Sequence, residues 1–346
     1  MPQINLPSTS AGNNTSTTPA TSASANNTSV NGGSTTVNNS NNPTASTLTN
    51  TPNSISTNNI QATTAKKNKY DDPNEIKVII SNKNIPIVIL FGPPSCGKTM
   101  LLIRLTRYLK SIGYSIKPIK TFRPADDDNY QNLCDKFDSL VNDDDAAKST
   151  SLIDFMLIEV LDKRGKSLCQ ILEGPGELYF DPLFPDKEYP AYINTITSCS
   201  NRKIWNIFVE PDWMNDVDRR NYVLRIEKLL KGRMDKSKDK TIFVCNKIDQ
   251  SNYVISRGKV NLSAARKHIM DLYPDIFNSF KNDNPISRFF REWKCDFIPF
   301  QTGYFTQSNR GLTYQEGPKE YPAMLWNKIH KPVSYTHLTL PTNSRV

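Results

Sequence analysis

Residues 92–99 carry the strongest chemical signal in the sequence. Two glycines bracket four residues and are followed by Lys98 and Thr99, which is the spacing G-x-x-x-x-G-K-[ST]. Glycine lets the backbone bend so that successive N–H groups point inward at phosphate oxygens. We expect Lys98 to reach the β- and γ-phosphates and Thr99 to place its hydroxyl on Mg²⁺. The predicted phosphate-binding residues are Gly92, Pro93, Pro94, Ser95, Cys96, Gly97, Lys98 and Thr99.

A second signal is the segment ILEGPGE at 171–177. Glu173 stands at the carboxyl end of an apolar run, and a glycine-bearing loop follows it. In that place an acid orients Mg²⁺, here through a metal-bound water, and the N–H of Gly176 would touch the γ-phosphate. Gly-Pro-Gly also forms ordinary turns, so the segment alone is a weak signal. Its position after a predicted core strand, close to the phosphate loop, is what indicates a metal site.

The tetrapeptide NKID at 246–249 selects the base. The carboxylate of Asp249 only accepts hydrogen bonds. Guanine offers N1–H and a 2-amino group as donors, whereas adenine offers neither at these positions, so a carboxylate facing adenine would be unpaired. We expect Asn246 to brace neighbouring loops and the stem of Lys247 to lie on the base. The pattern predicts GTP and GDP as ligands.

Alternating strands and helices must position these motifs. Apolar runs predict strands at 85–91, 152–161, 167–172, 204–209, 241–245 and 296–300. Helical spacing predicts helices at 100–111, 217–230, 262–272, 285–293 and 319–330. The predicted fold class is α/β: a P-loop NTPase with a mostly parallel central sheet, one antiparallel hairpin strand and helices on both faces.

The chain divides into segments of different composition. Residues 1–65 contain no charged side chain and are mostly Ser, Thr, Asn, Gly, Ala and Pro, which predicts a disordered arm over 1–66. The predicted nucleotide-binding domain covers 75–332, with an insertion at 114–150 that holds eight Asp and little periodicity. Residues 333–346 resemble a tail translated from sequencing-adapter DNA, so we expect a non-native end after about residue 332.

Composition limits the remaining possibilities. The formal net charge of +9 is spread over predicted helix faces and gives no specific nucleic-acid signal. No stretch approaches 18 consecutive apolar residues, so no membrane span is predicted. The six cysteines are scattered and form no Cys-x-x-Cys pair, which indicates a reduced, cytoplasmic protein.

In this order and on these strands, the three motifs resemble those of GTPases of the Ras-like translation-factor class, over roughly residues 85–305. The Pro-Gly-Glu ending of the second motif and the enlarged insertion resemble bacterial small-GTPase-like proteins called double-GTPases. The segment YLKSIGYSIKPIKTF is also similar to the helix-to-second-strand passage of the other large GTPase class, in which a parallel second strand would change the sheet order.

The resemblance implies further site residues. Thr150 would be the switch threonine that meets Mg²⁺ and the γ-phosphate, with Ser149 and Ser151 as competitors. Gln301 and Thr302 replace the Ser-Ala-Lys loop that reads guanine O6. Glu177 takes the place of a water-positioning Gln, and its charge beside a triphosphate implies hydrolysis at ~10⁻⁴ s⁻¹ or below. Together with Lys98, Thr150 and Glu177 form the expected catalytic set, and Thr99, Thr150 and Glu173 the expected metal set.

The sequence therefore predicts a GTP-binding switch with slow, Mg²⁺-dependent hydrolysis. An unknown protein effector would read residues 114–150 and 174–182, which GTP would order. Two alternatives stay open: a nucleotide-binding scaffold that never hydrolyses GTP, and an ATP-dependent kinase-like or ligase-like enzyme.

Overall fold

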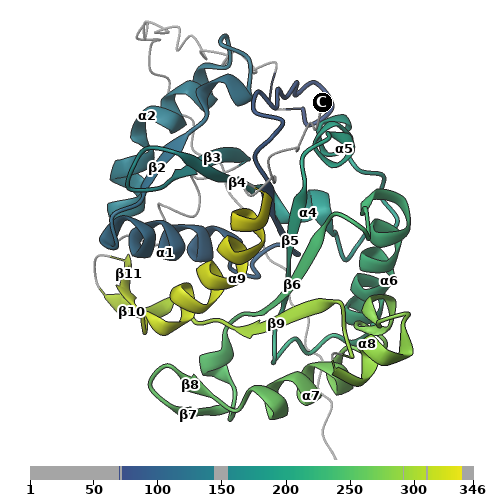
Figure 1. Cartoon of the computed structure of the whole chain (residues 1–346). Helices are drawn as coiled ribbons and strands as arrows, with labels where there is room; N and C mark the ends of the chain where they lie inside the picture. Colours follow the sequence, from purple (N-terminus) through teal and green to yellow (C-terminus); the bar gives the residue numbers. More distant parts are fainter. Residues whose placement is uncertain (1–69, 71, 144–154, 291, 309–310, 337–346) are drawn as a thin grey trace, which may run out of the picture. The chain divides into compact units, whose positions relative to one another are not determined.

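A seven-stranded sheet forms the centre of the structure (Figure 1). The computed structural model describes residues 70, 72–143, 155–290, 292–308 and 311–336, all of which belong to the unit Ala65–Val346. The strand order is β2-β3-β4-β1-β5-β6-β9. The strands are β1 (Ile87–Phe91), β2 (Ser115–Pro118), β3 (Met156–Leu161), β4 (Ser167–Glu173), β5 (Lys203–Val209), β6 (Lys240–Cys245) and β9 (Cys295–Pro299).

The pairing confirms the predicted fold class. β1 pairs in parallel with β4 and β5, and the parallel ladder continues through β6 to β9. β3 pairs antiparallel with β4 and with β2, so it alone among these seven strands runs in the opposite direction. All residues of β1 and β5 are buried, as expected for parallel strands covered on both faces.

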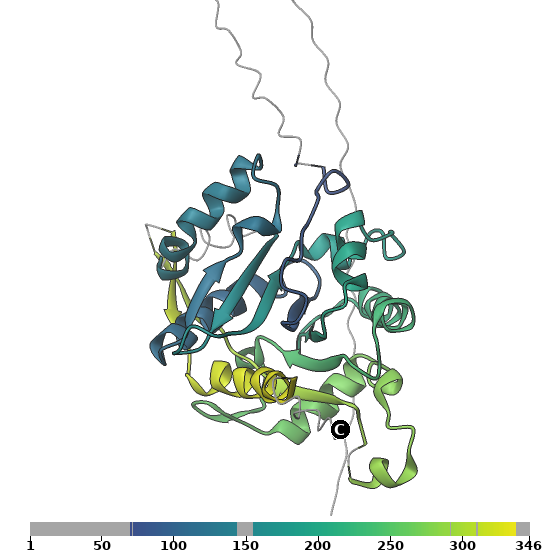
Figure 2. The same ribbon diagram turned by 45° about the horizontal axis from the view of Figure 1, so that its top comes forward.

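Helices cover both faces of this sheet (Figures 1 and 2). On one face lie α1 (Lys98–Ser111) and α9 (Glu320–Thr336). On the other lie α5 (Ala191–Ser198) and α6 (Asp216–Arg233), and Tyr222 of α6 stacks on Phe91 of β1 with ring centroids 6.1 Å apart. The sequence thus forms a three-layer α/β structure with its core on both sides of β1.

Shorter elements complete the described chain. The remaining helices are α4 (Gly176–Tyr179), α7 (Leu262–Leu272), α8 (Pro285–Phe290), η3 (Ile248–Gln250) and η4 (Asn278–Phe280). Two antiparallel hairpins stand outside the main sheet: β7 (Val254–Ser256) with β8 (Lys259–Val260), and β10 (Gly303–Ser308) with β11 (Gly311–Glu316). The second hairpin directly follows the loop after β9, which places it beside the carboxyl ends of the strands.

The start of 114–150 forms the strand β2, within the segment YSIKPIKTF that the sequence allows as a further strand. The expectation of an insertion without regular structure is wrong for the rest of the described part, which contains η2 (Lys120–Phe122) and α2 (Asp128–Asn142). Residues 144–150 lie outside the described residues. The side chain of Asp127 caps α2 by accepting from the N–H of Tyr130. The buried residues of α2 are Tyr130, Cys134, Phe137, Leu140 and Val141. This is helical spacing, which the many aspartates between these positions obscured.

The sheet also separates the two GTPase topologies that the sequence resembles. A parallel second strand was the feature that would favour the other large class. Instead β2 pairs antiparallel with β3, with Ser115 opposite Leu161 and Pro118 opposite Ile158. β3 and β4 form the hairpin predicted at 152–172, with residues 152–154 outside the description. The sheet therefore lacks the parallel pairing of the second strand that the other class would require.

Candidate nucleotide-binding site

A cavity of about 330 Å³ lies at the carboxyl ends of the parallel strands. This is the edge where ligands bind in open α/β sheets, because the loops that follow neighbouring strands meet there. The cavity brings together the loops after β1, β6 and β9. Its lining residues are Ser95, Gly97, Lys98, Thr99, Met100, Asn246, Lys247, Asp249, Gln250, Thr302, Gly303 and Phe305.

The loop 92–99 has the backbone conformation of an anion-binding nest. Ser95 has φ 60° and Gly97 has φ 86°, both in the left-handed region. A side chain at Gly97 would also bring its Cβ to 2.4 Å from Nδ2 of Asn246, so glycine is required there for two reasons. Pro93 and Pro94 have no N–H. Within 92–99 the N–H groups available to an anion therefore belong to Gly92 and to Ser95–Thr99, and α1 begins in the second group with its positive dipole end.

Lys98 is buried beneath this loop. Its Nζ donates to the carbonyl oxygens of Gly92 at 3.2 Å and Pro93 at 3.0 Å. These contacts hold the ammonium at the cavity, and its side chain is only 5% exposed. A buried cation bound to neutral carbonyl groups leaves a local positive charge that an anion would neutralise. The position fits the predicted contact with phosphate oxygens.

Thr99 and Glu173 bring two oxygen-bearing side chains together beside the phosphate loop. The Thr99 hydroxyl donates to Oε1 of Glu173 at 2.8 Å, although 74 residues separate them. Mg²⁺ prefers oxygen ligands, keeps several waters and uses one or two protein groups together with phosphates. A hydroxyl and a buried carboxylate in contact beside the phosphate loop fit this donor set. The third predicted metal ligand, Thr150, lies outside the described residues.

The loop after β4 reaches the phosphate loop through Gly176. A Cβ on Gly176 would lie 2.4 Å from the backbone nitrogen of Pro94 and 2.6 Å from the carbonyl oxygen of Pro93. Only glycine permits this approach of the two loops. The backbone of Gly176 is therefore placed beside the residues expected to bind the γ-phosphate.

Glu177, in contrast, points elsewhere. It is exposed in the first turn of α4 and lines a second cavity of about 700 Å³, formed with α2, Phe155 and the segment from Tyr70 to Ile76. Glu177 is not among the residues that line the cavity around Lys98 and Thr99. Its predicted role at the attacking water stays a prediction.

The loop after β6 joins the phosphate loop to the base side of the cavity. Nδ2 of Asn246 donates to the carbonyl oxygen of Cys96 at 2.8 Å. Lys247 has φ 54°, and its Nζ forms an ion pair with Oε2 of Glu210 at 2.8 Å. Burial raises the pKa of Glu210, and this ammonium partly offsets the shift. The left-handed residue turns the chain so that Asp249, in η3, also lines the cavity.

Asp249 is exposed to solvent at the cavity wall. Partial burial nevertheless raises the pKa of its carboxyl group, and the charge of Asp212 adds to the shift. Two donors from a ligand would favour the ionised form of this group. The carboxylate is thus placed where a base with paired donors would stabilise it.

The loop after β9 is fixed to the loop after β6. The N–H of Ile248 donates to the carbonyl oxygen of Phe300 at 3.2 Å, and the N–H of Phe300 donates to that of Cys245 at 2.8 Å. Thr302 lines the cavity, whereas Gln301 is buried and is not among the lining residues. Of these two predicted contacts, only Thr302 therefore faces the cavity.

Four residues at the site were not predicted from the sequence. Met100, Gln250 and Phe305 line the cavity, and Glu210 holds Lys247. Glu210 directly follows the predicted strand 204–209, so its position at the carboxyl edge was a usable signal. The hairpin that presents Phe305 has no comparable signal, because residues 303–316 lack an alternating apolar pattern.

The phosphate-loop cysteine should be chemically inert. Cys96 is 1% exposed, and burial raises the pKa of its thiol to about 12. The reactive thiolate then appears only at strongly alkaline pH. We expect iodoacetamide at pH 7.5 to leave Cys96 unmodified in the folded protein and to modify it after unfolding in urea. Mass spectrometry of the peptide that contains residue 96 measures this, and rapid labelling of the folded chain would contradict it.

The phosphate loop between β1 and α1, on a mostly parallel sheet with one antiparallel strand, makes this chain a protein of the P-loop NTPase fold. No family model and no curated protein matches the chain. In the part of the chain that the structure describes, no helix is both long and apolar enough to cross a membrane.

Solved structures of GTP-binding proteins share partial similarity with the chain. Nucleolar GTP-binding protein 1 from Plasmodium falciparum is 14% identical, over 76% of this chain and 94% of that chain, with a TM-score of 0.35. The Saccharomyces cerevisiae Ski7 GTPase-like domain, bound to GTP, is 15% identical over 75% and 51%, with a TM-score of 0.36. GDP-bound aIF5B from Aeropyrum pernix is 15% identical over 74% and 36%, with a TM-score of 0.33. At these values, the site assignments depend on this chain's own residues.

Proposed function

We propose that the chain binds GTP and GDP together with Mg²⁺ and acts as a nucleotide-dependent switch. One observation carries the proposal: the same cavity is lined by Lys98, Thr99 and Asp249. A triphosphate needs the amides and ammonium of the phosphate loop. A purine with two adjacent donors suits the carboxylate of Asp249.

The choice of guanine over adenine follows from hydrogen-bond chemistry. The Asp249 carboxylate accepts only, and guanine presents N1–H and the 2-amino group toward it. Adenine would leave the carboxylate without donors and place the N1 lone pair against it. Leaving a charged group unsatisfied costs about 1–3 kcal/mol or more. An ATP-dependent enzyme is therefore the less favoured alternative.

Mg²⁺ would be held by Thr99 and Glu173, and it would neutralise charge on the β- and γ-phosphates. The two side chains already contact each other. The loop after β4 starts at Glu173 and brings Gly176 to the phosphate loop. A γ-phosphate at this point would therefore act on 174–182, and we propose that a protein effector reads this segment and 114–150.

Hydrolysis is proposed to be slow. Glu177 is anionic and lines the second cavity, so it does not contribute a ready general base beside Thr99. This position specifically favours the second candidate, a scaffold that binds GTP without hydrolysing it. Single-turnover measurement of phosphate release from bound GTP separates the two: release above the background rate supports the switch, and its absence supports the scaffold.

The free cysteines suit a reducing compartment, so we propose a cytoplasmic location. The six cysteines are thiols outside any disulfide, and five of them are buried. Such usage is typical of proteins kept reduced by cellular thiols.

The decisive test is the selectivity of the full chain for nucleotides with and without Mg²⁺. Displacement of a fluorescent GTP analogue should show GTP and GDP binding at least about a hundredfold more tightly than ATP. Thr99→Val should remove the Mg²⁺-dependent gain in GTP affinity, a loss of about ten- to a hundredfold. Thr106→Val, in the same helix and equally isosteric, is the matched control because Thr106 does not line the cavity. Equal affinity for GTP and ATP, or no effect of Mg²⁺, would refute the proposal.

A further inference from the structure

Phe305 is the only aromatic side chain among the described residues that line the cavity. It is 42% exposed, although it lies in a regular strand. Single exposed apolar side chains are common on protein surfaces. This one differs because it lines the same cavity as Asp249 and Thr302.

We propose that Phe305 is the stacking platform for the purine base. The inference rests on the proposed nucleotide site and adds to it the group that binds the face of the base. Asp249 would accept hydrogen bonds from the edge of the base, and Phe305 would cover one face of the base. The stem of Lys247 lines the same cavity and is available to the opposite face. Stacking on an aromatic ring does not depend on the base, because every base has a π-face.

The ring is supported from behind by a second aromatic residue. Phe305 and Tyr314 are direct cross-strand partners in the β10–β11 hairpin, so their side chains share one face. Their ring centroids are 5.4 Å apart with an interplanar angle of 37°. Tyr314 is only 2% exposed, and the guanidinium of Arg107 lies 5.1 Å from its ring centroid. The side chains of Arg107, Tyr314 and Phe305 therefore contact one another in this order, and Phe305 is the one that lines the cavity.

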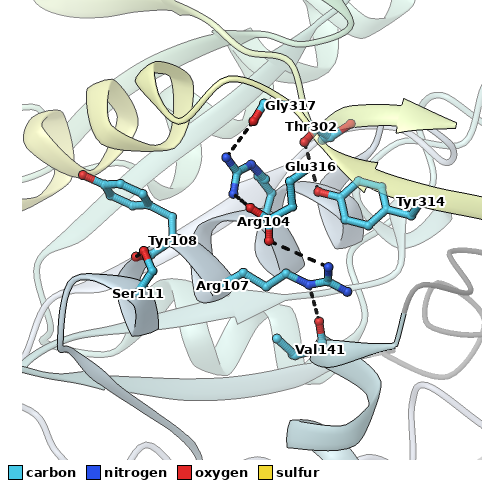
Figure 3. Close-up of polar contacts among 9 residues, drawn as sticks. All are labelled: Arg104, Arg107, Tyr108, Ser111, Val141, Thr302, Tyr314, Glu316 and Gly317. Carbon is cyan, nitrogen blue, oxygen red and sulfur yellow. Dashed lines mark hydrogen bonds and ion pairs between the residues drawn. The ribbon is translucent and has the colours of Figure 1, made fainter.

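Tyr314 also connects this stack to the loop after β9. Its hydroxyl donates to the carbonyl oxygen of Thr302 at 3.0 Å, and the N–H of Gly317 approaches the same oxygen at 3.4 Å (Figure 3). Thr302 itself lines the cavity. The hairpin and the loop that faces the base edge are thus held in one arrangement.

The hairpin is attached to the helix that begins at the phosphate loop. Figure 3 shows Arg104 and Arg107 projecting from α1 toward the end of the hairpin. Arg104, which is 3% exposed, forms an ion pair with Glu316 and donates to the carbonyl oxygen of Gly317 at 2.9 Å. Arg107 donates to the carbonyl oxygen of Val141 at the end of α2. Because α1 starts at Lys98, these contacts fix Phe305 relative to the phosphate-binding residues.

Neighbouring Tyr304 provides a matched control. It is 47% exposed and adjacent in the same strand, so its side chain points to the opposite face of the hairpin. It is not among the residues that line the cavity. Phe305→Ala and Tyr304→Ala therefore remove aromatic rings of similar size and exposure, and only the first ring faces the proposed base.

The test compares three displacers of a fluorescent GTP analogue on the full chain: GTP, GDP and inorganic tripolyphosphate, which has no base. Phe305→Ala should weaken GTP and GDP by about ten- to a hundredfold and leave displacement by tripolyphosphate unchanged. Tyr304→Ala should change none of the three. Phe305→Trp should restore tight binding, and its indole fluorescence should be quenched when GDP binds.

Each other outcome is decisive. Unchanged GDP affinity in Phe305→Ala, with a wild type that binds GDP, would overturn the stacking role and leave the proposed function standing. An equal loss for tripolyphosphate would show that the hairpin was damaged, which also overturns it. A wild type that prefers ATP would refute the guanine assignment, yet the loss on Phe305→Ala would still support stacking. A wild type that binds no nucleotide would refute both.

Discussion

Lys98→Ala should lower the affinity for GTP by at least about a hundredfold. The Lys98 ammonium is the buried cation of the cavity's phosphate end, and it is held by the carbonyl oxygens of Gly92 and Pro93. A hydrogen bond between charged groups contributes about 1.5–3 kcal/mol, and the ammonium is placed to reach two phosphates. Titration of a fluorescent GTP analogue, with GDP as a second ligand, measures the loss.

A folding defect must be separated from this effect. Removing the ammonium leaves two loop carbonyl groups without their donor, which we expect to lower the free energy of unfolding by about 1–3 kcal/mol. Circular dichroism and thermal unfolding show whether the variant remains folded. Lys110→Ala is the matched control, because Lys110 lies on the same helix and pairs with the exposed Asp138. Wild-type GTP affinity in a folded Lys98→Ala protein would contradict the phosphate assignment.

The parts of the fold that sequence predicts well are those with one dominant periodicity. The strand IPIVILF could only be a buried parallel strand, and β1 begins two residues inside its predicted start. The helix 262–272 has the predicted bounds because its apolar spacing and flanking residues agree, with Asn261 accepting from the N–H of Ala264. Local preference and tertiary burial pointed to the same structure at these positions.

The failures have specific physical causes. In α2 the apolar stripe is narrow and aspartates occupy the solvent face, so composition suggested an irregular insertion where a buried stripe faces α1 and η2. The β10–β11 hairpin depends on tertiary contacts: Arg107 lies against Tyr314, and Arg104 pairs with Glu316. No local pattern encodes these two arginine partners, which lie more than 200 residues away along the chain.

The candidate site likewise contains residues that the sequence predicts and residues that it does not. The motifs at 92–99 and 246–249 could be placed because they follow predicted strands, and the structure brings both to one cavity. Their spacing says nothing about which side chains complete the cavity wall. Phe305 could therefore not be found from the motifs, Glu210 was marked only by its position after a predicted strand, and Gln301 was assigned to a wall that only its neighbour Thr302 lines.

Asp249→Asn should change the preferred base from guanine to xanthine. Xanthine carries a carbonyl oxygen where guanine carries its 2-amino group, so it offers one acceptor and one donor to this position. The asparagine amide supplies the complementary donor and acceptor, whereas the carboxylate can only accept. We expect GTP affinity to fall by about a hundredfold or more and xanthosine triphosphate to bind more tightly than GTP.

The pH dependence of GDP binding provides a second test of the role of the Asp249 carboxyl group. The pKa of Asp249 is raised by partial burial, and the ionised form is the one that accepts from guanine. Lowering the pH protonates Asp249, so GDP affinity should fall, and the fall should begin at a higher pH than for an aspartate of ordinary pKa. The Asp249→Asn variant has no such group, so the difference between the two GDP profiles isolates the carboxylate.

Asp212→Asn is the control for general charge loss. Asp212 is exposed and does not line the cavity, and its charge contributes to the raised pKa of Asp249. Its removal should therefore lower that pKa, shift the GDP profile toward lower pH and leave the preference for guanine over xanthine intact. A base preference that changes equally in Asp212→Asn and Asp249→Asn would mean that the field of the cavity, and not a hydrogen-bonding carboxylate, selects the nucleotide.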